Sequence, residues 1–133
     1  MNRNVVEELQ GHGIQPSSQR VAIAQYILAT DQHPTADQVW TQVRKKFPVV
    51  SRATVYNTLN LFVEKGLLQE LHLAEDRVVF DSNLKPHHHF IDEESGRIHD
   101  IAWDRVQVCN MERLREYDVR DYQVVMRGKI RNQ

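Results

Sequence analysis

Apolar positions in the first half of the chain repeat at helical spacing between turn signals. Three helix starts are marked by capping residues, at a serine of the run Pro16-Ser17-Ser18, in the capping-box run 35–38 and at Ser51. Behind each start the apolar residues lie three or four positions apart, as on the buried face of a helix. Gly66 stands where a left-handed residue would end the last of these helices. We therefore expect three capped helices, preceded by a short one over residues 5–9.

A β-hairpin is predicted next. Residues 67–73 and 77–80 have strand-like composition, and residues 74–76 are expected to form the turn between them. Helices followed by a hairpin in this order are typical of a winged helix-turn-helix, in which the helix before the hairpin lies in the major groove of DNA. We therefore expect a winged-helix DNA-binding domain over residues 1–81.

The second half of the chain changes to a shorter period. Its expected elements are strands over 87–91, 97–102 and 121–129, a turn at 93–96 and a partly helical stretch at 105–116. Pro86 favours an extended hinge, which we place at 82–86. The remaining piece, 87–133, is short, and a domain below about 70 residues rarely stands alone without a metal or a partner chain. The predicted class is α+β, a winged helix-turn-helix followed by a small α/β domain.

Composition excludes several classes of protein. Hydrophobic residues make up 41% of the 133 positions and charged residues 26%, a normal globular balance that argues against wholesale disorder. No apolar run approaches the roughly 20 residues that span a bilayer, and the N-terminal residues lack a signal-peptide core. We expect a cytoplasmic protein with no membrane partner. The single cysteine, Cys109, excludes an internal disulfide and a Cys-x-x-Cys zinc knot.

The distribution of charge is more informative than its sum. The formal net charge of −1 gives no support for nucleic-acid binding. However, no acidic residue occurs from Gln38 to Val63, whereas four basic ones do, namely Arg44, Lys45, Lys46 and Arg52. A solvated helix face would give the same pattern, but a local basic patch is sufficient to attract DNA phosphates.

The helix that begins at Ser51 has two faces. One is apolar, and about 120° away lie uncharged side chains such as Tyr56 and Asn57, where a face meant only for solvent would carry lysine or glutamate. Asparagine and tyrosine can contact base edges and sugar-phosphate oxygens in the major groove, and Arg52 at the helix start can reach a phosphate. The expected DNA contacts are Arg20, Lys45, Lys46, Arg52, Thr54, Tyr56, Asn57 and Asn60.

Histidines and carboxylates in the second half have the spacing of metal ligands. Three of the seven histidines are consecutive, and on a strand His87 and His89 share a face while His88 points away. Asp81 lies six residues before His87, and Asp100 lies on the next expected strand. His33 lies in a loop before a capped helix. The candidate ligands are thus His33, Asp81, His87, His89 and Asp100.

The donor set indicates which metals the site would take. Three imidazoles and two carboxylates without sulfur suit Fe(II), Mn(II) or Zn(II), and five ligands exceed zinc's usual four. A five-coordinate ferrous ion has an open sixth position at which peroxide could bind.

Short motifs in this order resemble the ferric-uptake-regulator (Fur) family. They are His33-Pro34-Thr35-Ala36-Asp37, Ala53-Thr54-Val55-Tyr56-Asn57, Phe80-Asp81 and His87-His88-His89, and the likeness covers nearly the whole chain. The resemblance implies an N-terminal winged helix, a C-terminal dimerisation domain and a regulatory metal between them, held by the five candidate ligands. We therefore expect a metal-dependent repressor that binds pseudo-palindromic double-stranded operator DNA as a homodimer.

Two branches of this family remain open. Aspartate at positions 81 and 100 is more similar to the peroxide-sensing PerR-like branch than to the iron-sensing Fur branch, which places glutamates in this region. That likeness implies a response to peroxide through Fe(II) or Mn(II), with Zn(II) as a substitute and His33 and His87 as oxidation targets. The chain departs from most of the family because it lacks the two Cys-x-x-Cys pairs that hold the structural zinc. The segment 80–101 and the tail 122–129 also resemble the Irr-like branch, which responds to iron through haem. However, Cys109 is not followed by the proline of the haem-associated motif.

Two other classes of function could use the same residues. Two histidines and a carboxylate can form the facial triad of a non-haem iron enzyme, but the chain is short and shows no substrate-orienting cluster. A zinc-dependent interaction module without DNA would not require the acid-free helix. We therefore expect a regulator and not an enzyme.

Overall fold

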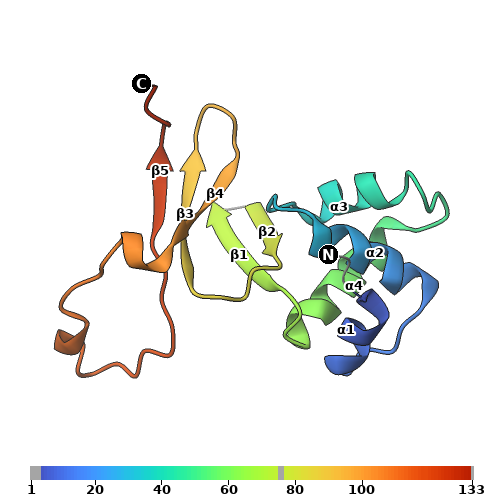
Figure 1. Cartoon of the computed structure of the whole chain (residues 1–133), viewed down its shortest axis with the longest axis horizontal. Helices are drawn as coiled ribbons and strands as arrows, with labels where there is room; N and C mark the ends of the chain where they lie inside the picture. Colours follow the sequence, from blue (N-terminus) through green and yellow to red (C-terminus); the bar gives the residue numbers. More distant parts are fainter. Residues whose placement is uncertain (1–3, 75–76, 133) are drawn as a thin grey trace. The chain divides into compact units, whose positions relative to one another are not determined.

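The computed structural model describes residues 4–74 and 77–132, which form two compact units (Figure 1). The first unit extends to Leu84 and the second begins at Lys85. The first unit contains the α-helices and one hairpin, and the second contains a separate small sheet. No helix in this part of the chain combines the length and apolar character that crossing a membrane requires.

Each α-helix of the first unit begins at a capping side chain. The helices are α1 (Val5–Gly11), α2 (Ser18–Ala29), α3 (Ala36–Val43) and α4 (Arg52–Glu64). Their caps are Asn4, Ser17, Thr35 and Ser51, and each accepts a hydrogen bond from a backbone N–H three residues ahead. These bonds satisfy donors that have no partner inside the helix. The predicted starts are confirmed, including the reciprocal capping box between Thr35 and Gln38.

The core of the first unit lies between these helices and the hairpin that follows them. Val55, Leu59 and Phe62 of α4 are completely buried, and Phe80 brings the hairpin into the same cluster. The hairpin pairs β1 (Gln69–Ala74) with β2 (Arg77–Asp81) antiparallel. Gly66 ends α4 with φ of +80°, a left-handed conformation that a glycine adopts without steric strain. The predicted turn at 74–76 falls mainly on residues 75 and 76, outside the described residues.

The second unit is a three-stranded sheet around the histidine strand. Its strands are β3 (His87–Asp92), β4 (Ile98–Ala102) and β5 (Val125–Gly128). The order is β4-β3-β5, with β3 antiparallel to β4 and parallel to β5. β3 is the central strand because it pairs with β4 on one side and β5 on the other. This position buries five of its six residues.

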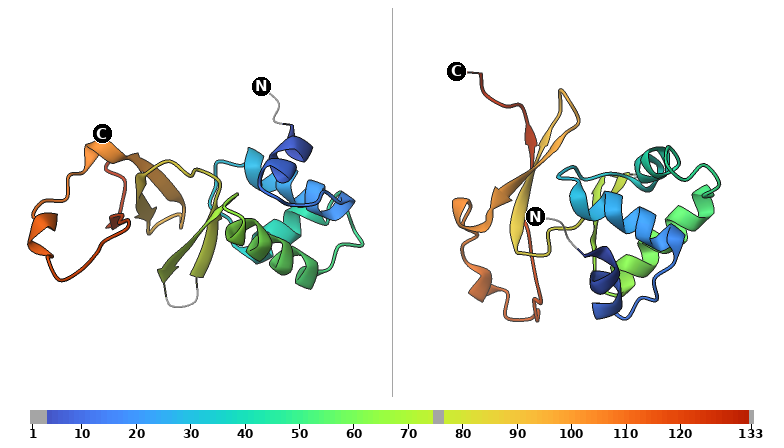
Figure 2. Two further views of the ribbon diagram at one scale, coloured as in Figure 1. Left: turned by 90° about the horizontal axis from the view of Figure 1, so that it is seen from below. Right: turned by 45° about the vertical axis from the view of Figure 1, so that its right-hand side comes forward.

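One expectation for the second unit is confirmed in part, and another needs correction. The stretch predicted to be partly helical, 105–116, contains a single 3₁₀ turn at Met111–Arg113, which follows Asn110 in a left-handed conformation. Another 3₁₀ turn, Trp103–Arg105, ends where the stretch begins. This connection loops out beside the sheet before the chain returns (Figure 2). The last strand is also shorter than predicted, because its ladder with β3 extends only from Val125 to Gly128.

Candidate functional site

The first unit brings one histidine and one aspartate together. His33 precedes α3, and the loop that carries it is tied to β2 because the Phe80 N–H donates to the Pro34 carbonyl at 2.9 Å. His33 and Asp81 are consequently neighbours, with 3.3 Å between Nε2 and Oδ2. Both side chains are buried. The other carboxylate oxygen of Asp81 accepts the Asn83 N–H at 2.8 Å, which holds Oδ2 toward the imidazole. We call these two residues the His33–Asp81 pair.

The second unit gathers two histidines and one aspartate on one face of its sheet. His89 and Asp100 are directly opposite each other in the β3–β4 ladder, and His87 lies two residues before His89. Asp100 Oδ1 lies 3.5 Å from His87 Nε2 and 3.7 Å from His89 Nε2. The histidines are buried, whereas the aspartate side chain is 37% exposed and leaves the group open on one side. These residues are the β3–β4 trio.

The middle histidine of the run faces the other side of the sheet, as strand alternation predicts. His88 stacks on Trp103 with ring centroids 4.5 Å apart, and its Nδ1 accepts the backbone N–H of Val124 at 2.9 Å. It is fully buried in these contacts. His88 therefore belongs to the packing of the second unit and not to the β3–β4 trio.

Hydrogen bonds select which nitrogen of each trio histidine is available as a ligand. The Nδ1 of His87 lies 2.6 Å from the Lys85 carbonyl, and the Nδ1 of His89 lies 2.7 Å from Oε1 of Gln123. Carbonyl and amide oxygens only accept, so each Nδ1 carries the proton. In both rings the Nε2 lone pair then faces Asp100, as is usual for metal-ligating histidines whose other nitrogen donates to a protein oxygen.

Each of the two groups has donor atoms that suit a divalent metal. A lone pair and a carboxylate oxygen are both acceptors and repel each other unless a cation or proton lies between them. A shared proton would draw nitrogen and oxygen to about 2.7–2.9 Å, shorter than the separations of 3.3, 3.5 and 3.7 Å found here. Metal bonds of about 2.0–2.2 Å place neighbouring ligand atoms roughly 3.0–3.5 Å apart. The side chains that could hold an ion are His33, Asp81, His87, His89 and Asp100.

The exposed face of α4 carries the side chains predicted to contact DNA. Val55 and Leu59 point into the core, whereas Tyr56, Asn57 and Asn60 are exposed and Thr54 is half-buried. Lys45 and Lys46 are exposed in the turn after α3. The neutral face expected from the sequence is therefore presented to solvent.

Arg52 is engaged in a way that the sequence did not indicate. Its Nε and Nη2 donate to the two carboxylate oxygens of Asp37 at 2.6 and 3.1 Å. The guanidinium also lies 5.4 Å from the centroid of the Tyr56 ring. The hydroxyl of Tyr56 and the carboxylate of Asp37 raise the pKa of Arg52 above its usual value. Asp37 immediately precedes the acid-free window, so the patch is less positive in space than along the chain.

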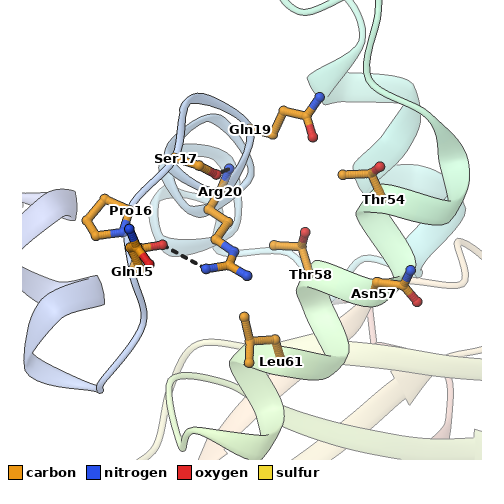
Figure 3. A pocket seen from close by; sticks show the side chains of 9 residues that line it. All are labelled: Gln15, Pro16, Ser17, Gln19, Arg20, Thr54, Asn57, Thr58 and Leu61. Carbon is orange, nitrogen blue, oxygen red and sulfur yellow. Dashed lines mark hydrogen bonds between the residues drawn. The ribbon is translucent and has the colours of Figure 1, made fainter.

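A polar cleft lies between the start of α2 and the exposed side of α4 (Figure 3). Its volume is about 490 Å³, and its lining residues are Gln15, Pro16, Ser17, Gln19, Arg20, Thr54, Asn57, Thr58 and Leu61. Arg20 extends across it from α2, with Nη1 donating to the Gln15 carbonyl at 2.8 Å. The cleft places Arg20, Thr54 and Asn57 around one space, although they come from two helices.

Sequence reasoning missed Asp37 as the partner of Arg52 and Gln123 as the partner of His89. The first could have been suspected, because Asp37 borders the basic window. The second carries no local signal, because 34 residues separate Gln123 from His89 and the parallel pairing of β5 with β3 brings them together.

Comparisons with known proteins agree with this arrangement. The ferric uptake regulator family matches residues 11–127. A curated relative, the peroxide-responsive repressor PerR of Staphylococcus epidermidis, is 34% identical over 119 residues, which cover 90% of this chain and 77% of the relative. A structure of the Pseudomonas aeruginosa ferric uptake regulator with manganese has a TM-score of 0.75 at 22% identity, covering 98% of this chain and 100% of that one. The Campylobacter jejuni peroxide stress regulator has a TM-score of 0.70 at 23% identity, covering 98% and 99%.

The structural matches confirm the predicted α+β class. The family match extends from the helices through the hairpin to the histidine strand and β5, so it includes every segment that carries a candidate ligand. The chain therefore belongs to the ferric uptake regulator family and is a metal-dependent transcriptional regulator, not an enzyme.

Proposed function

We propose that the chain is a peroxide-responsive, DNA-binding repressor whose affinity for its operator depends on one Fe(II) or Mn(II) ion. Zn(II) would occupy the same ligands as a substitute. The observation that carries the proposal is that each unit holds an incomplete set of ligands, two in the His33–Asp81 pair and three in the β3–β4 trio. Divalent metals of this kind take four to six ligands, so either group alone would leave several coordination positions to water, whereas the five side chains together would fill most of them. A single ion held by both groups would join the two units.

The first unit would bind the operator. We assign the major-groove contacts to Tyr56, Asn57 and Asn60 on the exposed face of α4. The cleft beside that face fits a stretch of sugar-phosphate backbone, because it is lined by hydroxyl and amide groups around one cation, Arg20. The other proposed DNA contacts are Lys45, Lys46, Arg52 and Thr54.

The second unit would form a homodimer. Among its described residues only Ile91 and Ile98 are buried hydrophobic side chains, a small core for an independent domain. Several large apolar side chains of the same unit are exposed, namely Leu114, Tyr117, Val119, Tyr122 and Ile130. A two-fold partner would cover such surface, and its symmetry would match a pseudo-palindromic operator. In this proposal residues 1–81 bind DNA, 82–86 are the hinge, and 87–133 dimerise and sense the metal.

Metal binding would act as a clamp. An ion shared by both groups would fix the angle between the DNA-binding and dimerisation domains, and hence the spacing of the two α4 helices in the dimer. A preference of the ion for the DNA-competent form by about 3–5 kcal/mol would move most of the population.

Peroxide would release this clamp by oxidising a ligand. Bound Fe(II) would supply the electrons that activate peroxide beside the imidazoles. Overall, one peroxide and one imidazole C–H of His33 or His87 would give one C–OH and one water, so the O–O and C–H bonds break while a C–O bond and an O–H bond form. The imidazole is the two-electron reductant, and the iron would regain from it the electrons given to peroxide. The oxidised ring is a poor ligand, so the two units would separate and the operator would be freed. The 34% sequence identity to a peroxide-responsive repressor supports the assignment to the PerR-like branch of the family.

Mass spectrometry of the oxidised protein tests the proposal. Peptides that contain His33 and His87 should each gain one oxygen after peroxide treatment of the Fe(II) protein and should remain unchanged in the Mn(II) protein. His72 serves as an internal control, because it is an exposed histidine on β1 outside both ligand groups. Loss of operator binding in a gel-shift assay should accompany the oxygen gain. No oxygen on any histidine of the Fe(II) protein would refute peroxide sensing and favour the iron- or haem-responsive alternative.

A further inference from the structure

We propose that Gln123 is a positioning residue for the regulatory metal, because it fixes the tautomer of His89 and makes Nε2 the ligand atom. The inference rests on the metal site proposed above, but its evidence lies entirely within the second unit. It begins from the hydrogen bonds of the three consecutive histidines, each of which has its Nδ1 in contact with a different partner.

Two of these tautomers are set by backbone groups. The Lys85 carbonyl can only accept a hydrogen bond, so His87 carries its proton on Nδ1. The Val124 N–H can only donate, so Nδ1 of His88 is unprotonated and its proton lies on Nε2. Neighbouring rings therefore hold opposite tautomers, which matches their opposite faces of the sheet. Apart from proline at position 124, no substitution removes either backbone group.

The tautomer of His89 depends on a side chain instead. Its Nδ1 donates to Oε1 of Gln123 at 2.7 Å, while its Nε2 faces Asp100. The His89 side chain is 1% exposed, so the ring has little access to water that could replace this acceptor. When the glutamine oxygen is removed, Nδ1 loses this acceptor and the proton is drawn to Nε2 by the Asp100 carboxylate. A protonated Nε2 cannot bind a metal.

The backbone holds Gln123 in place for this contact. The residue after it is bonded twice to β3, since Val124 donates to His88 Nδ1 and its carbonyl accepts the His89 N–H at 3.0 Å. These bonds mark the point where the long connection after β4 returns to the sheet alongside β3 (Figure 1). The tautomer of His89 therefore depends on the pairing of the C-terminal strand, β5, with β3. Because Gln123 itself is exposed, its replacement removes no side chain from the buried core.

The kind of side chain at position 123 should also change how strongly His89 binds the metal. A neutral amide polarises the imidazole less than a carboxylate would, and outer partners of this kind typically change metal affinity by about 10- to 100-fold. Gln123→Glu retains an acceptor and strengthens it, whereas Gln123→Leu removes it at similar size. Gln107→Leu is the matched control, because Gln107 is another exposed glutamine of the second unit.

The test has one readout without metal and one with it. In the metal-free, ¹⁵N-labelled full-length protein, two-bond ¹H–¹⁵N correlations report which nitrogen of His89 is protonated. Calorimetric titration with Mn(II) alone then gives the affinity. We expect Nδ1–H in the wild type, in Gln123→Glu and in Gln107→Leu, and a shift toward Nε2–H in Gln123→Leu. Mn(II) affinity should fall about 10- to 100-fold in Gln123→Leu and should be equal or higher in Gln123→Glu.

Three outcomes would overturn the inference. One is an Nε2–H tautomer of His89 in the metal-free wild type. Another is a Gln123→Leu protein that keeps the Nδ1–H tautomer and binds Mn(II) with unchanged affinity. A wild type that binds no Mn(II) would overturn the proposed metal site, and with it the ligand role assigned here, whatever the tautomer. Failure of the peroxide response alone, with Mn(II) bound as expected, would leave the role of Gln123 intact.

Discussion

The ion pair between Arg52 and Asp37 leads to a prediction about DNA affinity. Both carboxylate oxygens of Asp37 accept hydrogen bonds from the guanidinium of Arg52, which would otherwise be available to a phosphate. In the free protein, Asp37 therefore neutralises one positive charge at the edge of the exposed face of α4, which we call the DNA-reading face. We therefore expect Asp37→Asn to increase affinity for DNA of any sequence, because it releases Arg52 and removes a negative charge next to the phosphates.

The structure limits how much this change affects folding. The two side chains are 58% and 54% exposed, so solvent screens the pair and it adds little to stability. Asp37 also lies in the first turn of α3, where a negative charge adds about 0.3–1 kcal/mol. Neither loss is large against the roughly 5–15 kcal/mol of a typical domain. The variant should therefore remain folded.

The gain in DNA binding can be expressed as a salt dependence. One additional neutralised phosphate steepens the slope of log affinity against log salt by about 0.9, which amounts to a factor of about 3.5 between about 50 and about 200 mM salt. Fluorescence anisotropy with a labelled duplex of arbitrary sequence measures this slope without knowledge of the operator. Glu64→Gln is the charge control, since Glu64 ends α4 about 18 Å along the helix from Arg52, beyond the screening length of about 8–10 Å.

Two results would refute this reasoning. An unchanged slope in Asp37→Asn would mean that Arg52 does not reach phosphate when it is released. A fall in affinity would mean that Asp37 holds Arg52 in the position from which it contacts DNA. The double variant Asp37→Asn, Arg52→Ala should lose the gain entirely, because the effect acts through the guanidinium.

Further predictions concern the DNA-reading face and the sheet of the second unit. Tyr56→Ala should weaken specific operator binding by about 1–3 kcal/mol in a gel-shift assay while thermal unfolding is unchanged. Lys46→Ala should weaken binding to all sequences and lower the salt slope by about one, and unchanged affinity in both variants would contradict the assigned face. In the β3–β4 turn, hydrogen bonds from the Ser95 hydroxyl and the Glu94 N–H lower the pKa of Asp92. A lowered pKa in the folded state stabilises the protein above the ordinary carboxyl pKa, and this contribution is lost as the pH falls from about 4 toward the folded value. In urea unfolding, the stability difference between wild type and Asp92→Asn should therefore be largest at neutral pH and shrink in acid, and a constant difference would contradict the role of these bonds.

Local features of the sequence were sufficient for much of the fold. Caps at Ser17, Thr35 and Ser51 mark helix starts because each bonds to a backbone N–H only three residues ahead. Strand alternation placed His87 and His89 on one face and His88 on the other for the same reason, since the period of a strand is a property of neighbouring residues. These inferences needed no knowledge of distant segments.

Pairings between distant segments were decided only by the tertiary structure. Neither the bond from His89 to Gln123 nor the pair of Arg52 with Asp37 follows from spacing, because each depends on how two elements lie against each other. The same is true of β5, whose length is set by the residues of β3 available to accept and donate its hydrogen bonds. The sequence alone determined which residue types could hold a metal and contact DNA, through local periodicity and capping. Packing and strand register determined which atom of each histidine is presented and which charge of the basic patch is neutralised, because those depend on contacts between residues far apart in the chain.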